Sequence, residues 1–391
     1  MHCFRLLLLK KPLLVLLSFS IFALGFPFSA LAATDDGKNS AAVLCYHHIV
    51  PDEEAAETKS EATISVSEFE EQMRYLYDHG YYTASLTDIE NFLYFNKQLP
   101  ERTVLITFDD GYESNYTYAY PILRKYGLHA VIFLIGGAIE TPSSGTASIP
   151  KLSLDEIKEM SESGFIEFGS HTFNAHYLLD KKSAFVEMSL DEITKDFEDM
   201  KDFFDKAGAP KVLSIAYPYG QYDDKIVTSA VVEGYKLGFT VTSGFIYQDS
   251  SPMTLNRIIV PPGIGLDKFK TLINDTSEAL PEYYNGSIVL RIDSVTAYLG
   301  KQPVPLDAAP TYADGKLVAP LNFFKDVLKW DILWDNNTNK VARRITTRED
   351  VWFLLPTYLS RGQVMVPVRE LAEKMGHQVI WHQNDKTVEI K

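Results

Sequence analysis

From residue 41 to about residue 266 the chain alternates short apolar runs with longer amphipathic stretches. Short apolar runs are typical of strands buried on both faces of a sheet, and the amphipathic stretches between them are typical of crossover helices. The alternation predicts an α/β fold with a parallel sheet. The seven expected strands are residues 42–46, 104–107, 130–134, 166–169, 213–216, 237–242 and 257–260.

Helical periodicity appears between these runs in residues 66–79, 153–163 and 190–207. In the second of these stretches Ser153 can cap the first turn, and Glu156 can complete a capping box. Strands separated by helices in this way favour a distorted (β/α) barrel of about seven strands over an open sheet, although the pattern leaves the closure of the sheet undecided. In such a barrel the residues that follow each strand meet at one rim, where the chemistry of these folds lies.

The pattern changes after residue 271. Residues 272–286 are polar and predict a linker or a terminal helix, and residues 287–391 contain an internal repeat with an offset of 47 residues and no gaps. Each copy predicts a strand, a helix and a two-stranded hairpin. A unit this small cannot bury its own apolar face, so we expect the two copies to pack together as one small α+β domain. The matching pairs include Gly315 with Gly362, Pro320 with Pro367, Trp334 with Trp381, and Val341 with Val388.

Residues 1–32 have the pattern of a secretory signal peptide. Three basic residues precede an apolar stretch, and Ala30-Leu31-Ala32 supplies a small-x-small cleavage site. We therefore expect a secreted or cell-surface protein that begins at residue 33. Cleavage would remove Cys3 and leave Cys45 as the one cysteine, which excludes an intramolecular disulfide in the mature chain.

The composition is acidic, with 52 Asp and Glu against 37 Lys and Arg and a net charge of −15. Such a surface repels nucleic acid, so no nucleic-acid partner is expected. A neutral polysaccharide is compatible with this charge.

Two polar clusters follow apolar runs. Asp109 and Asp110 end the second expected strand, and His171 and His176 follow the fourth. Two histidines five residues apart diverge by roughly 140° on a helix and lie on opposite faces of a strand, so only a loop can aim both at one ion. Two aspartates and two histidines are enough for one metal ion and one general base, which is the minimum set for metal-assisted hydrolysis.

These residues resemble a known family. Thr107-Phe108-Asp109-Asp110-Gly111-Tyr112 and the His171/His176 pair are similar to the first two motifs of polysaccharide deacetylases of the NodB-like, carbohydrate esterase 4 type. The five-residue histidine spacing and Cys45-Tyr46-His47-His48-Ile49 resemble the branch that de-N-acetylates poly-β-1,6-N-acetylglucosamine. The resemblance implies a deacetylase domain in residues 33–271 and a metal-dependent hydrolase of N-acetylglucosamine-containing polysaccharide.

The resemblance also implies roles for single residues. Asp110, His171 and His176 would bind Zn²⁺ or another divalent transition metal, and Asp109 would be the general base. The alternative is that both aspartates bind the metal. His47 would be the general acid, because the unperturbed pKa of histidine is near neutrality. Its neighbour His48 is the rival for this role. Adjacent strand residues face opposite ways, so only one of the two histidines can point into the site.

Ala216-Tyr217-Pro218-Tyr219-Gly220 resembles the third motif of the family, in which the backbone N–H of Tyr219 would help to hold the oxyanion. Ala216 stands where an arginine usually pairs with the catalytic aspartate. Arg257 is a candidate to replace that arginine, and an ordinary structural ion pair is the alternative for it. The late leucine-x-histidine motif has no match, which fits a general acid displaced to His47 and fits a weak catalyst equally well.

The repeat in residues 287–391 resembles the copper amine oxidase N-terminal-like domain, through the segments 314–321 and 362–369. His377 and His382 lack partners at a metal-binding spacing, so we expect surface histidines and a binding or spacer module that attaches the enzyme to cell wall or matrix. Two other functions remain open at this point. One is a peptidoglycan or chitin-oligomer deacetylase, and the other is a non-catalytic wall or matrix protein that binds glycan.

Overall fold

The computed structural model describes residues 39–391 except 59, 141–148, 210–211, 276, 336–337, 339, 344–350 and 354. The signal peptide expected in residues 1–32 lies outside the described residues. Within the described part of the chain, no helix combines the length and the apolar character needed to cross a bilayer.

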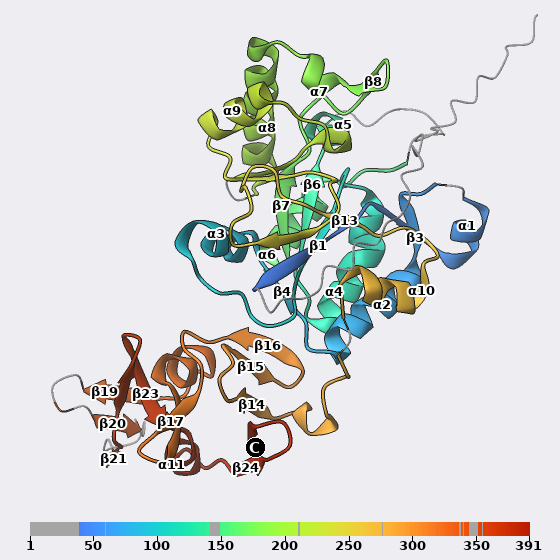
Figure 1. Ribbon diagram of the computed structural model, residues 1–391. Coiled ribbons are helices and arrows are strands. Elements are labelled where there is room, and N and C mark those ends of the chain that lie inside the picture. Colours follow the sequence, from blue (N-terminus) through green and yellow to red (C-terminus); the bar gives the residue numbers. More distant parts are fainter. Residues whose placement is uncertain are drawn as a thin grey trace, which may run out of the picture. The chain divides into compact units, whose positions relative to one another are not determined.

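Seven parallel strands between residues 40 and 259 form one curved sheet, a half-barrel whose two edge strands are not paired with each other (Figure 1). They correspond to the seven strands expected from the sequence. The order across the sheet is β11, β10, β7, β6, β5, β1, with β13 on the far side of β1. Two short strands extend this sheet: β4 (Tyr82–Thr83) pairs with β5, and the antiparallel β12 (Phe245–Tyr247) pairs with β1. The seven are β1 (Ser40–Tyr46), β5 (Thr103–Phe108), β6 (Ala130–Leu134), β7 (Ile166–Ser170), β10 (Ser214–Ala216), β11 (Leu237–Phe239) and β13 (Ile258–Ile259).

An irregular segment completes the ring. Phe239 at the end of β11 forms a single parallel bridge with Leu255, which lies just before β13. The Leu255 N–H donates to Gly238 O at 2.7 Å, and the Thr240 N–H donates to Leu255 O at 2.9 Å. Because one side of the ring is joined by so few hydrogen bonds, the structure is the distorted (β/α) barrel that the alternation predicts.

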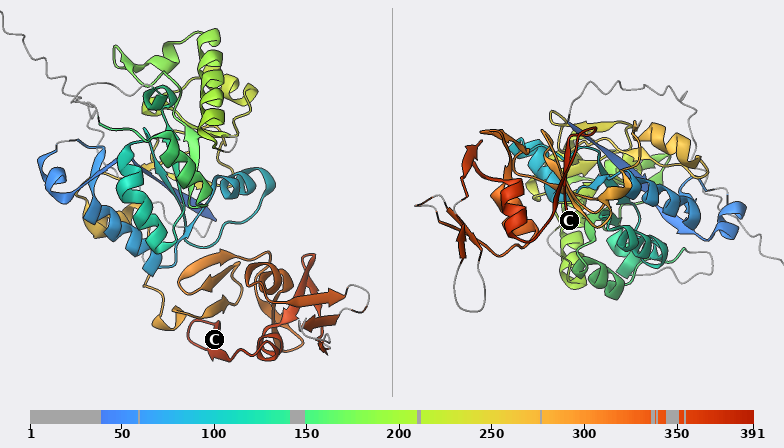
Figure 2. Two further views of the ribbon diagram at one scale, coloured as in Figure 1. Left: turned by 180° about the vertical axis from the view of Figure 1, so that it is seen from behind. Right: turned by 90° about the horizontal axis from the view of Figure 1, so that it is seen from below.

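Helices cover the outside of the sheet. The expected helices are present as α2 (Val66–Asp78), α6 (Leu154–Glu162) and α8 (Leu190–Ala207), and Ser153 and Glu156 form the expected capping box at α6. Helices α2 and α4 lie side by side over one face (Figure 2). The remaining elements of this part are α1 (Asp52–Glu57), α3 (Leu86–Phe95), α4 (Tyr120–Tyr126), α5 (Gly136–Glu140), α7 (Ala184–Glu187), α9 (Asp224–Val232), α10 (Gly265–Leu272), β2 (His48–Val50), β3 (Thr63–Ser65), β8 (Leu178–Leu179) and β9 (Lys182–Ser183).

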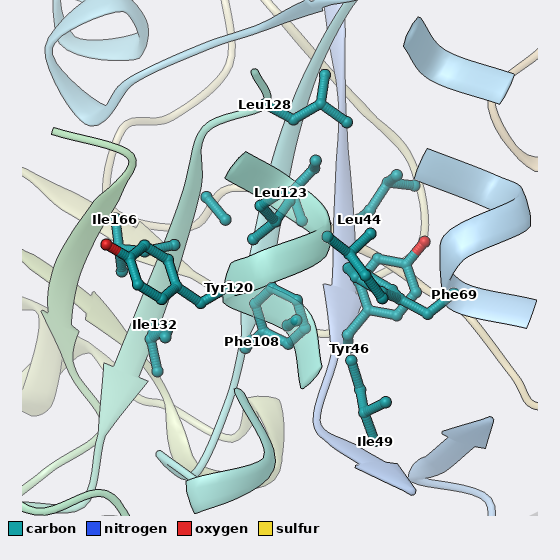
Figure 3. Close-up of a cluster of buried hydrophobic side chains, with 14 of the residues drawn as sticks. Leu44, Tyr46, Ile49, Phe69, Phe108, Tyr120, Leu123, Leu128, Ile132 and Ile166 are labelled. Carbon is teal, nitrogen blue, oxygen red and sulfur yellow. The ribbon is translucent and has the colours of Figure 1, made fainter. Parts of the chain in front are cut away.

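Alternate residues of the central strands face two different cores. Leu44 and Ile132 face outward and pack with Phe69 of α2 and Leu123 of α4 (Figure 3). The intervening residues, among them Val43, face a second core inside the barrel. Successive strand side chains point to opposite faces, so this inner register includes position 45 in β1 and position 107 in β5, and it continues to positions 47 and 109 just after these strands.

The C-terminal part repeats its structure with the offset found in the sequence. Strand β18 pairs antiparallel with β23, so that Ala319 lies opposite its own counterpart Val366. One apolar core is formed by residues of both copies, as expected from their size. The first copy has β17 (Thr311–Ala313), β18 (Lys316–Pro320), a π-helical turn (Phe323–Val327), β19 (Ile332–Asp335) and β20 (Lys340–Arg343); the second has β22 (Tyr358–Ser360), β23 (Gln363–Pro367), α11 (Val368–Lys374), β24 (Val379–His382) and β25 (Thr387–Ile390).

Further strands join each hairpin of the repeat. Strands β14 (Ile288–Arg291), β15 (Thr296–Leu299) and β16 (Gln302–Pro305) extend the sheet of β24 and β25, and β21 (Val351–Phe353) pairs with β20. Helix α10 ends at Leu272, and a 3₁₀ turn (Glu282–Tyr284) precedes β14. The boundaries 272–286 for a linker and 287–391 for the second domain stay predictions.

Candidate active site

A left-handed turn brings the two adjacent aspartates to one place. Asp109 directly follows β5, and Asp110 has a φ of 73°. Aspartate tolerates this conformation better than most residues. Both carboxylates consequently approach the same histidine: Asp109 Oδ2 lies 3.9 Å and Asp110 Oδ1 lies 3.5 Å from His171 Nε2.

Asp110, His171 and His176 form a group whose ligand atoms all lie within 4.8 Å of one another. Asp110 Oδ1 is 3.3 Å from His176 Nε2. His171 Nδ1 lies 2.7 Å from the carbonyl oxygen of Ala216. A carbonyl only accepts, so Nδ1 carries the proton and the lone pair of Nε2 faces the group, as in many histidine ligands of metals.

The chemistry of this group fits a divalent cation. Asp110 Oδ1 is buried and accepts no hydrogen bond within the described part of the chain. A buried carboxylate oxygen without a donor is costly, and a cation would remove the cost. Burial, with a smaller contribution from His171, lowers the pKa of His176 to about 4, so its imidazole is neutral and can act as a ligand at neutral pH.

Both histidines stand on the loop after β7, as the five-residue spacing predicts. Asp196 of α8 holds this loop: its two carboxylate oxygens accept the backbone N–H groups of Phe173 at 2.8 Å and Asn174 at 2.7 Å. The sequence reasoning missed Asp196. The available signal was an acidic residue on the otherwise apolar face of an amphipathic helix.

Arg257 makes a bidentate ion pair with Asp109. Its Nη1 and Nη2 each lie 2.7 Å from one carboxylate oxygen, and its Nε donates to Thr240 O at 2.8 Å. Both residues are buried, and Arg257 has no exposed surface. Burial alone would raise the pKa of Asp109, but the Arg257 guanidinium and, to a smaller extent, His171 outweigh it and hold the pKa well below its usual range. Arg257 thus makes the contact with Asp109 that a replacement for the arginine absent at Ala216 requires, and its role as that replacement stays a prediction.

His47 and Cys45 approach Asp109 from the inner register of β1. His47 Nε2 lies 4.0 Å and Cys45 Sγ lies 3.7 Å from Asp109 Oδ2. His48 faces away, since its Nδ1 lies 2.8 Å from Ser114 Oγ and its ring packs on Tyr112. Of the two adjacent histidines, His47 is thus the one beside the aspartates.

Tyr219 lies next to the histidine pair. It has a φ of 57°, and its ring stacks on His176 with centroids 4.6 Å apart. The sequence reasoning missed one more residue near the site, Lys151, whose Nζ lies 3.6 Å above the ring of Tyr112. No motif marked this lysine, because a backbone bridge between residues 112 and 151 brings it there from a distant part of the chain.

Comparison with known proteins agrees with this geometry. The polysaccharide deacetylase family matches residues 96–238, and the copper amine oxidase N-terminal domain family matches residues 266–342 and 347–391. The chain is 32% identical over 231 residues to YxkH of Bacillus subtilis (strain 168), a protein named as a polysaccharide deacetylase by inference. This match covers 59% of the present chain and 75% of YxkH. It is also 32% identical over 214 residues, 54% of its length, to the poly-beta-1,6-N-acetyl-D-glucosamine N-deacetylase of Staphylococcus aureus (strain MSSA476), and covers 71% of it.

Solved structures show the same fold. The Streptococcus pyogenes deacetylase PplD superposes with a TM-score of 0.53 at 30% identity, over 60% of this chain and 99% of that one. IcaB from Ammonifex degensii gives a TM-score of 0.53 at 27% identity, over 60% of this chain and 96% of that one. The chain therefore belongs to the polysaccharide deacetylase family, whose members hydrolyse the N-acetyl amide bonds of N-acetylglucosamine polysaccharides.

Proposed function

We propose that this protein is a secreted zinc enzyme that deacetylates poly-β-1,6-N-acetylglucosamine. The observation that carries the proposal is a candidate metal group, Asp110, His171 and His176, with the ionised carboxylate of Asp109 beside it. The relatives named for this glycan, at 32% identity, favour it over peptidoglycan or chitin oligomers. Family membership favours turnover over the binding of glycan alone.

In this assignment Asp110, His171 and His176 hold the metal ion, which when bound supplies a Lewis acid at the acetyl carbonyl. Asp109 takes the proton of the attacking water, because Arg257 keeps its carboxylate ionised and fixes its orientation. The backbone N–H of Tyr219 is assigned to the developing oxyanion.

His47 is assigned to protonate the leaving sugar amine. It lies 4.0 Å from Asp109, so the proton taken from water and the proton given to the amine are handled on one side of the site. Burial lowers the pKa of His47, and Asp109 and Asp110 oppose that shift. The product amine is cationic at neutral pH, which changes how the polymer adheres to anionic surfaces.

The test is metal analysis of the purified protein together with acetate release from oligomers of two linkages. We expect about one zinc per chain and faster release from β-1,6-linked than from β-1,4-linked N-acetylglucosamine. Faster release from the β-1,4-linked oligomers would favour the peptidoglycan or chitin alternative. Bound metal without acetate from either oligomer would overturn the proposal.

We also propose export through residues 1–32 and attachment to cell wall or matrix through residues 287–391. The export proposal rests on the charge and apolar pattern of the N-terminus, and the attachment proposal rests on the separate repeat domain. N-terminal sequencing of protein from the culture medium should start at residue 33. Co-sedimentation with wall material should be lost in a chain that ends at residue 286, and equal sedimentation of both chains would refute attachment.

A further inference from the structure

A groove of about 450 Å³ lies next to Tyr219, because the following residue, Gly220, is part of its lining. One wall follows His176 along the chain and the other follows Tyr219, and the rings of these two residues stack on each other. The lining of the groove therefore begins one residue from Tyr219, which borders the site. It is lined by Lys182, Val186, Glu187, Gly220, Gln221, Tyr222 and Asp223.

Tyr222 offers a fixed aromatic surface to this groove. Its side chain is 40% exposed, and one face of its ring stacks on Tyr217 with centroids 5.2 Å apart. Tyr217 is itself fully buried, and its hydroxyl donates to Met253 O at 2.9 Å. A ring held in this way loses little conformational freedom when a ligand stacks on its other face.

The two walls of the groove are tied together. The Ser183 N–H donates to Gln221 Oε1 at 2.9 Å, and Lys225 Nζ donates to Val186 O at 3.2 Å. The groove is therefore formed before any ligand binds. Along its edge, Lys182 and Glu187 offer a charged donor and a charged acceptor, 3.0 Å apart and open to solvent.

We propose that this groove is a subsite for the sugar unit next to the one that is deacetylated, with Tyr222 as its stacking platform. The proposal rests on the proposed function and adds a specificity-determining residue to it. A pyranose ring presents a C–H face that suits an aromatic surface and hydroxyl groups that suit charged side chains at the edge. The volume lies within the range of about 300–1,000 Å³ that is usual for ligand clefts.

The test compares substrates that do and do not reach the groove. We expect Tyr222→Ala to raise the KM for a β-1,6-linked N-acetylglucosamine pentamer roughly tenfold, with a smaller change in kcat. Tyr222→Phe should keep the wild-type KM. Hydrolysis of a small activated acetyl ester, which reaches only the metal group, should be unchanged in both variants.

Tyr94→Ala is the matched control. Tyr94 is 50% exposed on α3, and its hydroxyl donates to Lys236 O before the start of β11, at the opposite end of the barrel. An unchanged KM for the pentamer in Tyr222→Ala would overturn the subsite. An equal loss on the small ester would also overturn it, because Tyr222 would then support the metal group rather than the glycan.

Failure of the proposed function would look different. In that case the wild-type protein itself would release no acetate from the pentamer. Calorimetric binding of the pentamer to Asp109→Asn, with and without Tyr222→Ala, needs no turnover and tests the groove independently. Equal affinity of these two proteins for the pentamer would refute the subsite.

Discussion

The rim of the barrel and the repeat domain both contain residues in the left-handed backbone conformation, but these residues serve different purposes in the two regions. In the repeat domain, Asp314 and Arg361 have a φ of 48° at equivalent hairpin turns, where a left-handed residue simply reverses the chain. At the rim, Asp110 and Thr172 are left-handed and buried beside charged groups. Strain and buried charge that improve no packing persist where function requires them.

The core of each region makes the same contrast. Arg257 and Asp109 are a charged pair in the barrel interior, whereas the repeat domain fills its centre with apolar residues from both copies. Within the described residues, two groups of three side chains could hold a metal ion, Asp110 with His171 and His176 and Cys45 with His47 and Asp109, and both lie in the barrel. Activity and domain stability should therefore respond to different substitutions.

Asp109→Asn should have the largest effect. The amide cannot take a proton from water, so kcat should fall by roughly 10²–10⁴-fold. Zinc content measured by atomic emission should be unchanged, since the candidate ligands are Asp110, His171 and His176. Loss of zinc together with activity would show that both aspartates bind the metal, which is the alternative left open by the sequence.

Arg257→Met should be the most damaging change to the stability of the barrel. It leaves the buried Asp109 carboxylate without its counter-ion, and breaking such a pair costs about 3–5 kcal/mol of unfolding free energy. Denaturant unfolding measures this loss. The double variant with Asp109→Asn should recover part of it, and simple additivity of the two losses would argue against direct coupling.

The repeat domain supplies a matched pair of smaller changes. Val341 and Val388 occupy equivalent positions and are both buried in its core. Val341→Ala and Val388→Ala should each cost roughly 1.5–3 kcal/mol in the unfolding of this domain and leave acetate release from soluble oligomers unchanged. Very unequal losses would show that the two copies do not contribute alike.

The smallest expected effect is the loss of stability when acid protonates Asp109 and breaks its ion pair with Arg257. The folded-state pKa of Asp109 is depressed, so its contribution to stability is present above about pH 4 and is lost as the pH falls below that value. The contribution changes by about 1 kcal/mol per pH unit in that range. Unfolding followed from pH 5 to pH 2.5 should therefore be less steep for Asp109→Asn than for the wild type.

The sequence predicted regular elements well because their signals are local. Apolar runs marked all seven parallel strands, and Ser153 and Glu156 marked the start of α6. Alternation of side chains also predicted that only one of His47 and His48 can face the site, and the structure places His47 beside Asp109.

The parts that the sequence did not predict depend on contacts between distant segments. Asp196 and Lys151 reach the site from a helix and a bridge that no motif identifies. The sequence leaves two roles open for Arg257, because its contact with Asp109 depends on the pairing of β13 with β1 and of β1 with β5. The structure shows the contact of Arg257 with Asp109, and the Arg257→Met variant measures its contribution to stability.

The left-handed turn at Asp110 also limits how this site can evolve. Glutamate would keep a carboxylate at position 110 but disfavours that backbone conformation, whereas asparagine would keep the conformation and lose the charge. The next residue is equally restricted, since a Cβ at Gly111 would lie 2.7 Å from the side chain of Leu134. Single substitutions here lead to loss rather than to a new ligand set, so descendants of this enzyme should diversify in the groove around Tyr222 while Asp109-Asp110-Gly111 is inherited as one unit.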